Sequence, residues 1–150
     1  PGCSIIPVRY LNHQGLGDTE DAIHGIYYAI KRKASVINLS FSGEGFDPDL
    51  KRAIEEAGNN DILVIACASN DESNLDRESI YPAKFNLPNL ITVAASDALG
   101  RLWEGSNWGK NSVHLAAPGD EILGLWLKDW DTGSGTSDSA AVLSGAAGLV

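Results

Sequence analysis

Methionine is absent from these 150 residues, and cysteine occurs only twice. Cys3 and Cys67 form no Cys-x-x-Cys pair or other metal-ligand spacing, so neither a redox motif nor a zinc site is indicated. Cys67 lies inside an apolar run, which favours a free, buried thiol. Because the chain opens at Pro1 and lacks methionine, it reads as an excised or processed piece of a longer protein.

Long apolar runs are also missing. None approaches the roughly 20 residues that a membrane-spanning helix requires, and no basic, apolar N-terminal signal is present. Basic residues are few, since 11 Lys and Arg stand against 20 Asp and Glu, for a formal net charge of −9. That charge argues against nucleic acid, whose binding depends on neutralising phosphates. We therefore expect neither a membrane nor a nucleic acid as a partner.

The residues that are present predict one α/β domain spanning 1–150. Short apolar runs alternate with amphipathic helices, the pattern of a mostly parallel sheet covered on both faces. The expected strands are 4–11, 36–39, 62–66, 90–95, 113–116 and 122–126. The expected helices run from Asp18 or Thr19 to about Lys33, from Pro48 to about Gly58, and onward from about Ser137. Their expected core residues are Ile23, Ile26, Tyr27 and Ile30, and then Leu50, Ala53, Ile54 and Ala57.

Small and polar residues follow two of the expected strands. The strand at 36–39 leads into Ser40-Phe41-Ser42-Gly43, and the strand at 62–66 leads into Cys67-Ala68-Ser69-Asn70. In open α/β sheets, ligands bind outside the carboxyl ends of the strands. The segment 70–89 is the longest irregular stretch, and loops of that length are usually functional or flexible.

A glycine-rich segment, Gly133-Ser134-Gly135-Thr136-Ser137, precedes the last expected helix. A helix N-terminus has unpaired N–H groups and suits an oxyanion or a phosphate. Taken alone, Ser137 is more often a helix cap than a nucleophile, and Asn70 more often a turn residue than an oxyanion donor. A phosphate loop is disfavoured because the segment lacks a Gly-Lys-Ser/Thr ending.

Together these pieces resemble the subtilisin family of serine proteases, over nearly the whole chain. The matching motifs occur in the family's order: Val36-Ile37-Asn38-Leu39-Ser40, residues 64–70, Tyr81-Pro82-Ala83, residues 89–95, Ser106-Asn107-Trp108-Gly109, Ala116-Ala117-Pro118-Gly119, Gly135-Thr136-Ser137 and Gly145-Ala146-Ala147. The resemblance implies a three-layer α/β/α fold whose N-terminal part is missing. It also implies a cis peptide bond at Tyr81-Pro82.

The resemblance assigns catalytic roles to two residues. Ser137 would attack the scissile carbonyl, and Asn70 would stabilise the oxyanion together with the backbone N–H of Ser137. Two segments would bind the polypeptide substrate. Residues Ser40, Phe41, Ser42 and Gly43 would pair with it by strand addition, and residues Ala66, Cys67, Ala68 and Ser69 would form one wall of a pocket with room for a bulky apolar group.

Three departures from the family pattern concern catalysis. The family's aspartate and its histidine, in a His-Gly-Thr context, have no match here, and neither His13, His24 nor His114 lies in such a setting. Ser69 stands where the family has glycine before the asparagine. Asp138 follows Ser137, where a carboxylate would oppose the developing negative charge.

The sequence therefore predicts a piece of a serine endopeptidase that works through an acyl-enzyme on Ser137 but is nearly inactive alone. The alternative is a non-catalytic, protease-like domain that binds peptides or a partner protein. Without the family's central strands, the chain should associate with itself or with a missing N-terminal segment. The resemblance implies no required cofactor, allows calcium without placing its ligands, and favours an extracellular location.

Overall fold

The computed structural model describes residues 2–126 and 129–150. Its helices are α1 (Thr19–Lys31), α2 (Pro48–Asn59) and α3 (Thr136–Ala147). Its strands are β1 (Val36–Leu39), β2 (Gly43–Glu44), β3 (Leu63–Cys67), β4 (Ile80–Tyr81), β5 (Leu90–Ser96), β6 (Leu115–Pro118), β7 (Ile122–Trp126) and β8 (Asp129–Gly133). None of the described helices combines the length and apolar character needed to cross a bilayer.

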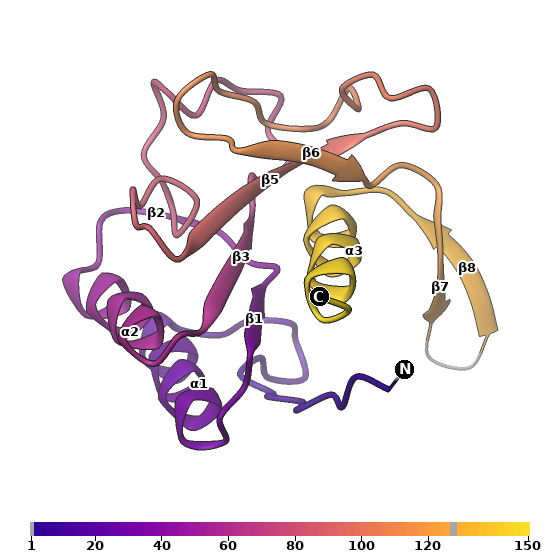
Figure 1. Cartoon of the computed structure of the whole chain (residues 1–150). Coiled ribbons are helices and arrows are strands. Elements are labelled where there is room, and N and C mark those ends of the chain that lie inside the picture. The colour runs from indigo at the N-terminus through magenta and orange to yellow at the C-terminus, as the bar shows by residue number, and fades with distance from the viewer. Residues whose placement is uncertain (1, 127–128) are drawn as a thin grey trace.

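Four strands form a parallel sheet in the order β1-β3-β5-β6. Helices α1 and α2 lie on one face, and α3 packs against all four strands from the other (Figure 1). The predicted three-layer α/β/α architecture is confirmed. Within the described residues, β1 pairs only with β3, so its outer edge has no strand partner.

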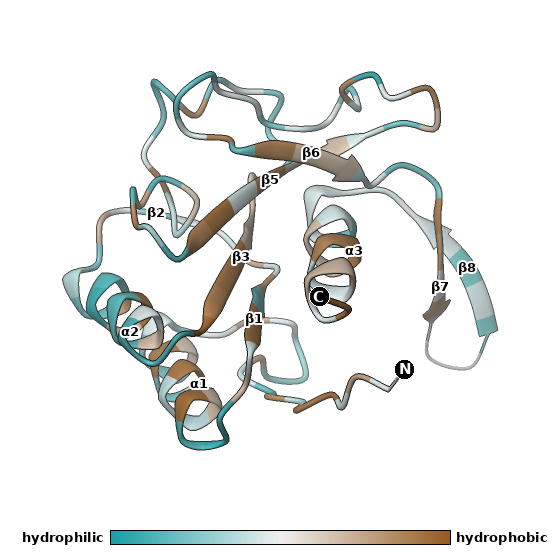
Figure 2. Cartoon of the chain, in the orientation of Figure 1, coloured by the Kyte–Doolittle hydropathy of each residue, from teal (hydrophilic) through white to brown (hydrophobic). Residues whose placement is uncertain are grey.

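The alternation of side chains along β3 builds a core on each face of the sheet. Val64 and Ala66 join the cluster that contains the inner faces of α1 and α2. Ile65 and Cys67 join the cluster beneath α3. All four are buried, as a central strand covered on both faces requires. Figure 2 shows the resulting hydrophobic colour along β3 and β5.

Both N-terminal helices begin at an aspartate, as predicted. The Asp18 carboxylate accepts the backbone N–H of Asp21, and the Asp47 carboxylate accepts those of Asp49 and Leu50. The predicted core stripe of α2 is confirmed, since all four of its residues are buried. On α1 the prediction for Tyr27 is wrong, because that side chain is 41% exposed and the smaller Ala22 and Ala29 face the core instead.

The predicted strand at 4–11 is wrong. This segment is extended but joins no sheet, and Pro7 within it has no N–H to donate to a ladder. Two of its side chains show its neighbours, since Val8 lies against α1 and Tyr10 against Phe41, which follows β1. A Cβ at Gly25 would come within 2.9 Å of Val8 Cγ1, and the Tyr10 ring lies 5.2 Å from that of Phe41.

Two smaller differences concern the second half of the chain. Strand β6 begins at Leu115, two residues later than predicted, and β7 pairs with an antiparallel strand, β8, in a segment that the sequence predicts as loop. The irregular stretch 70–89 contains β4, which pairs with β2 and brings residues 80–81 beside 43–44. The predicted cis bond between Tyr81 and Pro82 is present.

Candidate active site

The candidate site lies where β1 and β3 end. The two strands are parallel neighbours in register, with Leu39 opposite Ala66. Their carboxyl ends therefore place Ser40 beside the segment that leads to Asn70. Helix α3 packs across both strands, and its first residues complete the group.

Asn70 is tied to the first residue of α3. Its Oδ1 accepts a hydrogen bond from the backbone N–H of Thr136 at 2.9 Å and another from the Thr136 hydroxyl at 2.8 Å. The backbone donor fixes which end of the amide is the oxygen, because an N–H can only bond to an acceptor. The Nδ2 group of Asn70 is consequently left as a donor at the start of the helix.

Gly135 supplies the space around that donor. A Cβ built on Gly135 would lie 3.3 Å from Asn70 Nδ2 and 3.5 Å from the Asp138 carboxylate. The backbone of Gly135 is extended, with φ 170°, so glycine is needed here for room rather than for conformation.

Ser137 is the second residue of α3 and is held against the end of β1. Its hydroxyl donates to the Ser40 carbonyl at 3.3 Å, and the Ser40 hydroxyl donates to the Ser137 carbonyl at 3.0 Å. Cys67 lies beneath this pair. Burial raises the pKa of the Cys67 thiol, although the hydroxyls of Ser137 and Thr136 offset part of the rise.

No histidine in the described residues is hydrogen-bonded to Ser137. The Nδ1 atom of His114 accepts the backbone N–H of Thr92 at 3.0 Å, so this ring serves the sheet. His13 lies in an exposed turn, and His24 is exposed on α1. Within the described residues, the Ser137 hydroxyl therefore has no hydrogen-bonded base, which a serine nucleophile requires.

Asp138 is the third residue of α3 and is partly buried. Burial raises the pKa of its carboxyl above the ordinary range, and its own backbone N–H lowers it in part. The carboxylate thus lies in the first turn of the same helix that carries Ser137, where it adds negative charge.

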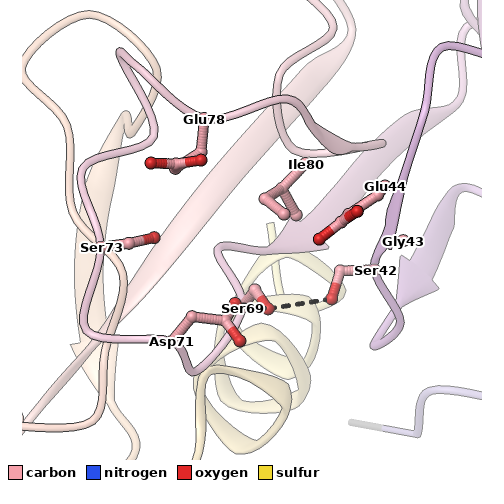
Figure 3. Close-up of a pocket in the computed structure, with 8 residues that line it drawn as sticks. All are labelled: Ser42, Gly43, Glu44, Ser69, Asp71, Ser73, Glu78 and Ile80. Carbon is pink, nitrogen blue, oxygen red and sulfur yellow. Dashed lines mark hydrogen bonds between the residues drawn. The ribbon is translucent and has the colours of Figure 1, made fainter.

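A pocket of about 350 Å³ opens beside these residues (Figure 3). Its lining comes from three segments and consists of Ser42, Gly43, Glu44, Ser69, Asp71, Ser73, Glu78 and Ile80. Among the predicted substrate-binding residues, only Ser42, Gly43 and Ser69 line it. Ala66, Cys67 and Ala68 are buried instead, and Phe41 packs into the core with Tyr10 and Tyr81.

Ser69 has a left-handed backbone, with φ 76°. That conformation disfavours residues with a Cβ and explains why glycine suits this position. Its hydroxyl is nevertheless used, because it donates to the Asp71 carboxylate at 2.6 Å and accepts from Ser42 at 3.1 Å. Ser69 therefore makes two side-chain contacts at the edge of the pocket while its backbone is held in an unfavourable conformation.

Asn107 organises the loop that forms the pocket wall. Its buried Oδ1 accepts the backbone N–H groups of Asp71 at 2.8 Å and Ser73 at 3.0 Å. The backbone continues the connection, since Trp108 N donates to Ser73 O and Leu75 N donates to Trp108 O. The motif at 106–109 did not predict this role. Asn107 lies in the loop between β5 and β6, and no local feature of the sequence marks its burial.

The outer part of the same loop is tied down by Asp76. Burial would raise the pKa of this carboxyl, but hydrogen bonds from the Ser112 hydroxyl and from backbone N–H groups of residues 110–112 lower it below its usual range. The carboxylate accepts from Ser112 Oγ at 2.9 Å and from Asn111 N at 3.0 Å. In 2–126 and 129–150, no group of three or more His, Cys, Asp or Glu side chains is arranged to hold a metal ion.

The whole chain matches a known protein family. The model of the subtilase family covers residues 1–150. The chain belongs to the subtilase family. Its relatives include the major intracellular serine protease of Bacillus subtilis strain 168, 36% identical over 154 aligned residues that cover all of this chain and 47% of that protein. Thermitase of Thermoactinomyces vulgaris is 33% identical, with all of this chain and 52% of that protein covered.

Solved structures of subtilases agree with the fold. A cold-adapted subtilisin-like serine proteinase superimposes with a TM-score of 0.84 at 28% identity, covering 94% of this chain and 50% of that one. The chain thus spans about half the length of each of these three proteins. The name of the Bacillus relative includes the word intracellular, so family membership alone does not favour an extracellular location.

Proposed function

We propose that this chain supplies the nucleophile and oxyanion half of a subtilisin-like serine endopeptidase. Ser137 attacks the scissile carbonyl, its bond to the carbonyl carbon forms an acyl-enzyme, and the amine leaves with a proton. The Nδ2 group of Asn70 and the backbone N–H of Ser137 donate to the oxyanion. The observation that carries the proposal is the pair of bonds from Thr136 to Asn70 Oδ1, because it leaves the amide donor free beside Ser137.

The base is proposed to come from outside these 150 residues. A serine hydroxyl is a weak nucleophile at neutral pH unless a base takes its proton. The relatives are about twice as long as the chain. A longer parent protein with an aspartate and a His-Gly-Thr segment before Pro1 would complete the site. The unpaired outer edge of β1 is a natural place for strands of that segment to join the sheet.

The substrate is proposed to be an extended polypeptide. Residues 40–43 continue from the edge strand β1, and their backbone can pair with a substrate strand. The pocket at Ser42, Gly43 and Ser69 then receives one substrate side chain. No cofactor is needed for this chemistry, and calcium remains a proposal without assigned ligands.

A non-catalytic, protease-like domain is the second candidate. It is favoured by the bond from the Ser137 hydroxyl to the Ser40 carbonyl, which holds the hydroxyl on the protein rather than on a base. Asp138 beside Ser137 would also oppose an oxyanion. Such a domain would bind peptides along residues 40–43 without cutting them.

Two measurements separate the two candidates. The first is the coding sequence that precedes Pro1, and the second is fluorophosphonate labelling of its product. An upstream Asp and His-Gly-Thr with rapid, Ser137-dependent labelling supports the endopeptidase. A longer parent without them, whose Ser137 is inert, supports the binding domain. A Ser137→Ala variant is the control in both cases.

A further inference from the structure

The pocket beside Ser69 is acidic on three sides. Glu44 comes from β2, while Asp71 and Glu78 come from two places in the loop between β3 and β4 (Figure 3). The small residues at 66–69 predict room for a bulky apolar group, but only Ser69 among them lines the pocket. The walls that face them carry negative charge.

These three carboxylates have no basic side chain paired with them in the part of the chain that is described. The ion pairs there join Lys51 to Glu55, Arg52 to Asp49, and Arg101 to Asp97, all outside the pocket. Lys84 donates to the backbone carbonyl of Glu78 at 2.5 Å rather than to its carboxylate. The pocket therefore keeps its negative charge for a ligand.

A metal ion does not explain the charge. A divalent cation needs its oxygen ligands gathered within about 2.6 Å of one point, and the carboxylates of this pocket form no such group. They surround a space of about 350 Å³, at the small end for a ligand pocket. Ile80 adds an apolar surface, and the hydroxyls of Ser42, Ser69 and Ser73 add acceptors.

That combination matches a long side chain with an apolar stem and a cationic head. On the basis of the proposed function, we propose that this pocket binds a cationic side chain of the substrate, that of arginine or lysine, in preference to other side chains. The methylene stem packs on Ile80, and the head lies among Glu44, Asp71 and Glu78. Asp71 is held for this role by Ser69 at 2.6 Å and by Asn107.

The test compares three fluorescein-labelled peptides that differ at one position, which is Arg, citrulline or Phe. Citrulline keeps the shape of arginine without its charge. Titration of the 150-residue chain, followed by fluorescence anisotropy, should give the Arg peptide a Kd roughly 3- to 10-fold lower than the citrulline peptide at low salt. Raising the ionic strength from about 0.02 M to about 0.5 M should shrink that preference.

The variant Glu44→Gln/Glu78→Gln removes two charges without removing any recorded side-chain hydrogen bond and should bring the preference below about 2-fold. Glu20→Gln, which removes one exposed charge on α1, is the matched control and should leave the preference unchanged. Any one of four results would overturn the proposal. These are equal affinity for the Arg and citrulline peptides, tighter binding of the Phe peptide, no binding of any peptide, or an equal loss of preference in the Glu20→Gln control. The outcome is independent of catalysis. An Arg preference together with a Ser137 that stays inert in the longer parent protein removes only the endopeptidase, and binding without charge preference removes only the cationic pocket.

Discussion

The side-chain oxygen of Asn70 accepts two hydrogen bonds from a single residue, Thr136, 66 positions further along the chain. The pair joins the end of β3 to the first turn of α3. It also sets the direction of the Asn70 amide, so the proposed oxyanion donor depends on a buried threonine.

Thr136→Val should destabilise the chain by about 1 kcal/mol, because it keeps the shape of this buried residue but removes one of the two bonds to Asn70. The backbone bond remains, so the fold should survive. Urea denaturation monitored by circular dichroism measures the change. Thr132→Val, at an exposed position on β8, is the control and should change stability by less than about 0.5 kcal/mol. Equal effects of the two variants would show that the Asn70 contact has no energetic weight.

Ser69→Gly should be more stable than Ser69→Ala by about 1 kcal/mol. Both variants lose the hydroxyl contacts to Asp71 and Ser42, but only glycine relieves the left-handed backbone at φ 76°. Comparing the two variants with each other cancels the lost hydrogen bonds. Thermal or urea denaturation gives the difference, and an alanine variant as stable as the glycine variant would mean that this backbone is not strained.

Asp138→Asn should stabilise the chain at pH 7, by roughly 0.5 kcal/mol for a partly buried surface group. Burial raises the pKa of Asp138 in the folded state. Its contribution to stability is then fully present below the unfolded pKa, about 3.9, and is lost as pH rises through the folded pKa. The advantage of the variant should therefore disappear below about pH 3.9.

Asp21→Asn is the matched control, since Asp21 holds the same third position in α1 and is exposed. It should cost a few tenths of a kcal/mol at neutral pH, because a carboxylate in the first turn interacts favourably with the helix dipole. Urea denaturation of both variants from pH 3 to pH 8 gives the comparison. A loss of stability in Asp138→Asn at pH 7 would mean that the dipole outweighs burial at α3.

Most strands of the sheet and the helix starts could be predicted from the sequence because each depends on local pattern. The aspartate before Thr19 and the Asp47-Pro48 pair mark helix starts, and the apolar runs at 36–39 and 90–95 mark strands covered on both faces. The segment 4–11 has the same apolar character but no neighbour in register. Strand formation there depends on a partner, which local pattern cannot reveal.

The candidate site could also be predicted only in part from the sequence. Ser137 and Asn70 could be singled out by their places after a glycine-rich segment and after a buried strand. The role of Asn107 and the acidic walls of the pocket could not, because Asn107, Glu44, Asp71 and Glu78 are brought together by loops far apart in sequence. Of the residues 66–69, alternation along β3 turns Ala66 and Cys67 into the core, so that only Ser69 reaches the pocket.

The unpaired edge of β1 should make the isolated chain associate. Among the residues that the structure describes, the outer edge of β1 has no strand partner, and such an edge is a template for another strand. Apolar side chains elsewhere on the surface are also exposed, with Leu149 at 66% and Ile5 at 88%. Light scattering over a tenfold range of concentration should show a mass that rises with concentration. Adding a Lys in place of Asn38, whose side chain is exposed on β1, should reduce the effect. A mass of 15.9 kDa that stays constant across the range would contradict this expectation.

Fluorophosphonate labelling of the isolated 150-residue chain, beside Ser137→Ala, tests the central claim that these residues hold the nucleophile and oxyanion donor but not the base. In subtilisin, a member of this family, loss of the histidine lowers kcat by about 10⁶-fold, and we take the scale of the expected loss from that enzyme. We expect labelling of the chain alone to be no faster than that of a free serine peptide. We also expect rapid labelling at Ser137 once an N-terminal segment carrying the Asp and His is supplied. Rapid, Ser137-dependent labelling of the chain by itself would contradict the central claim.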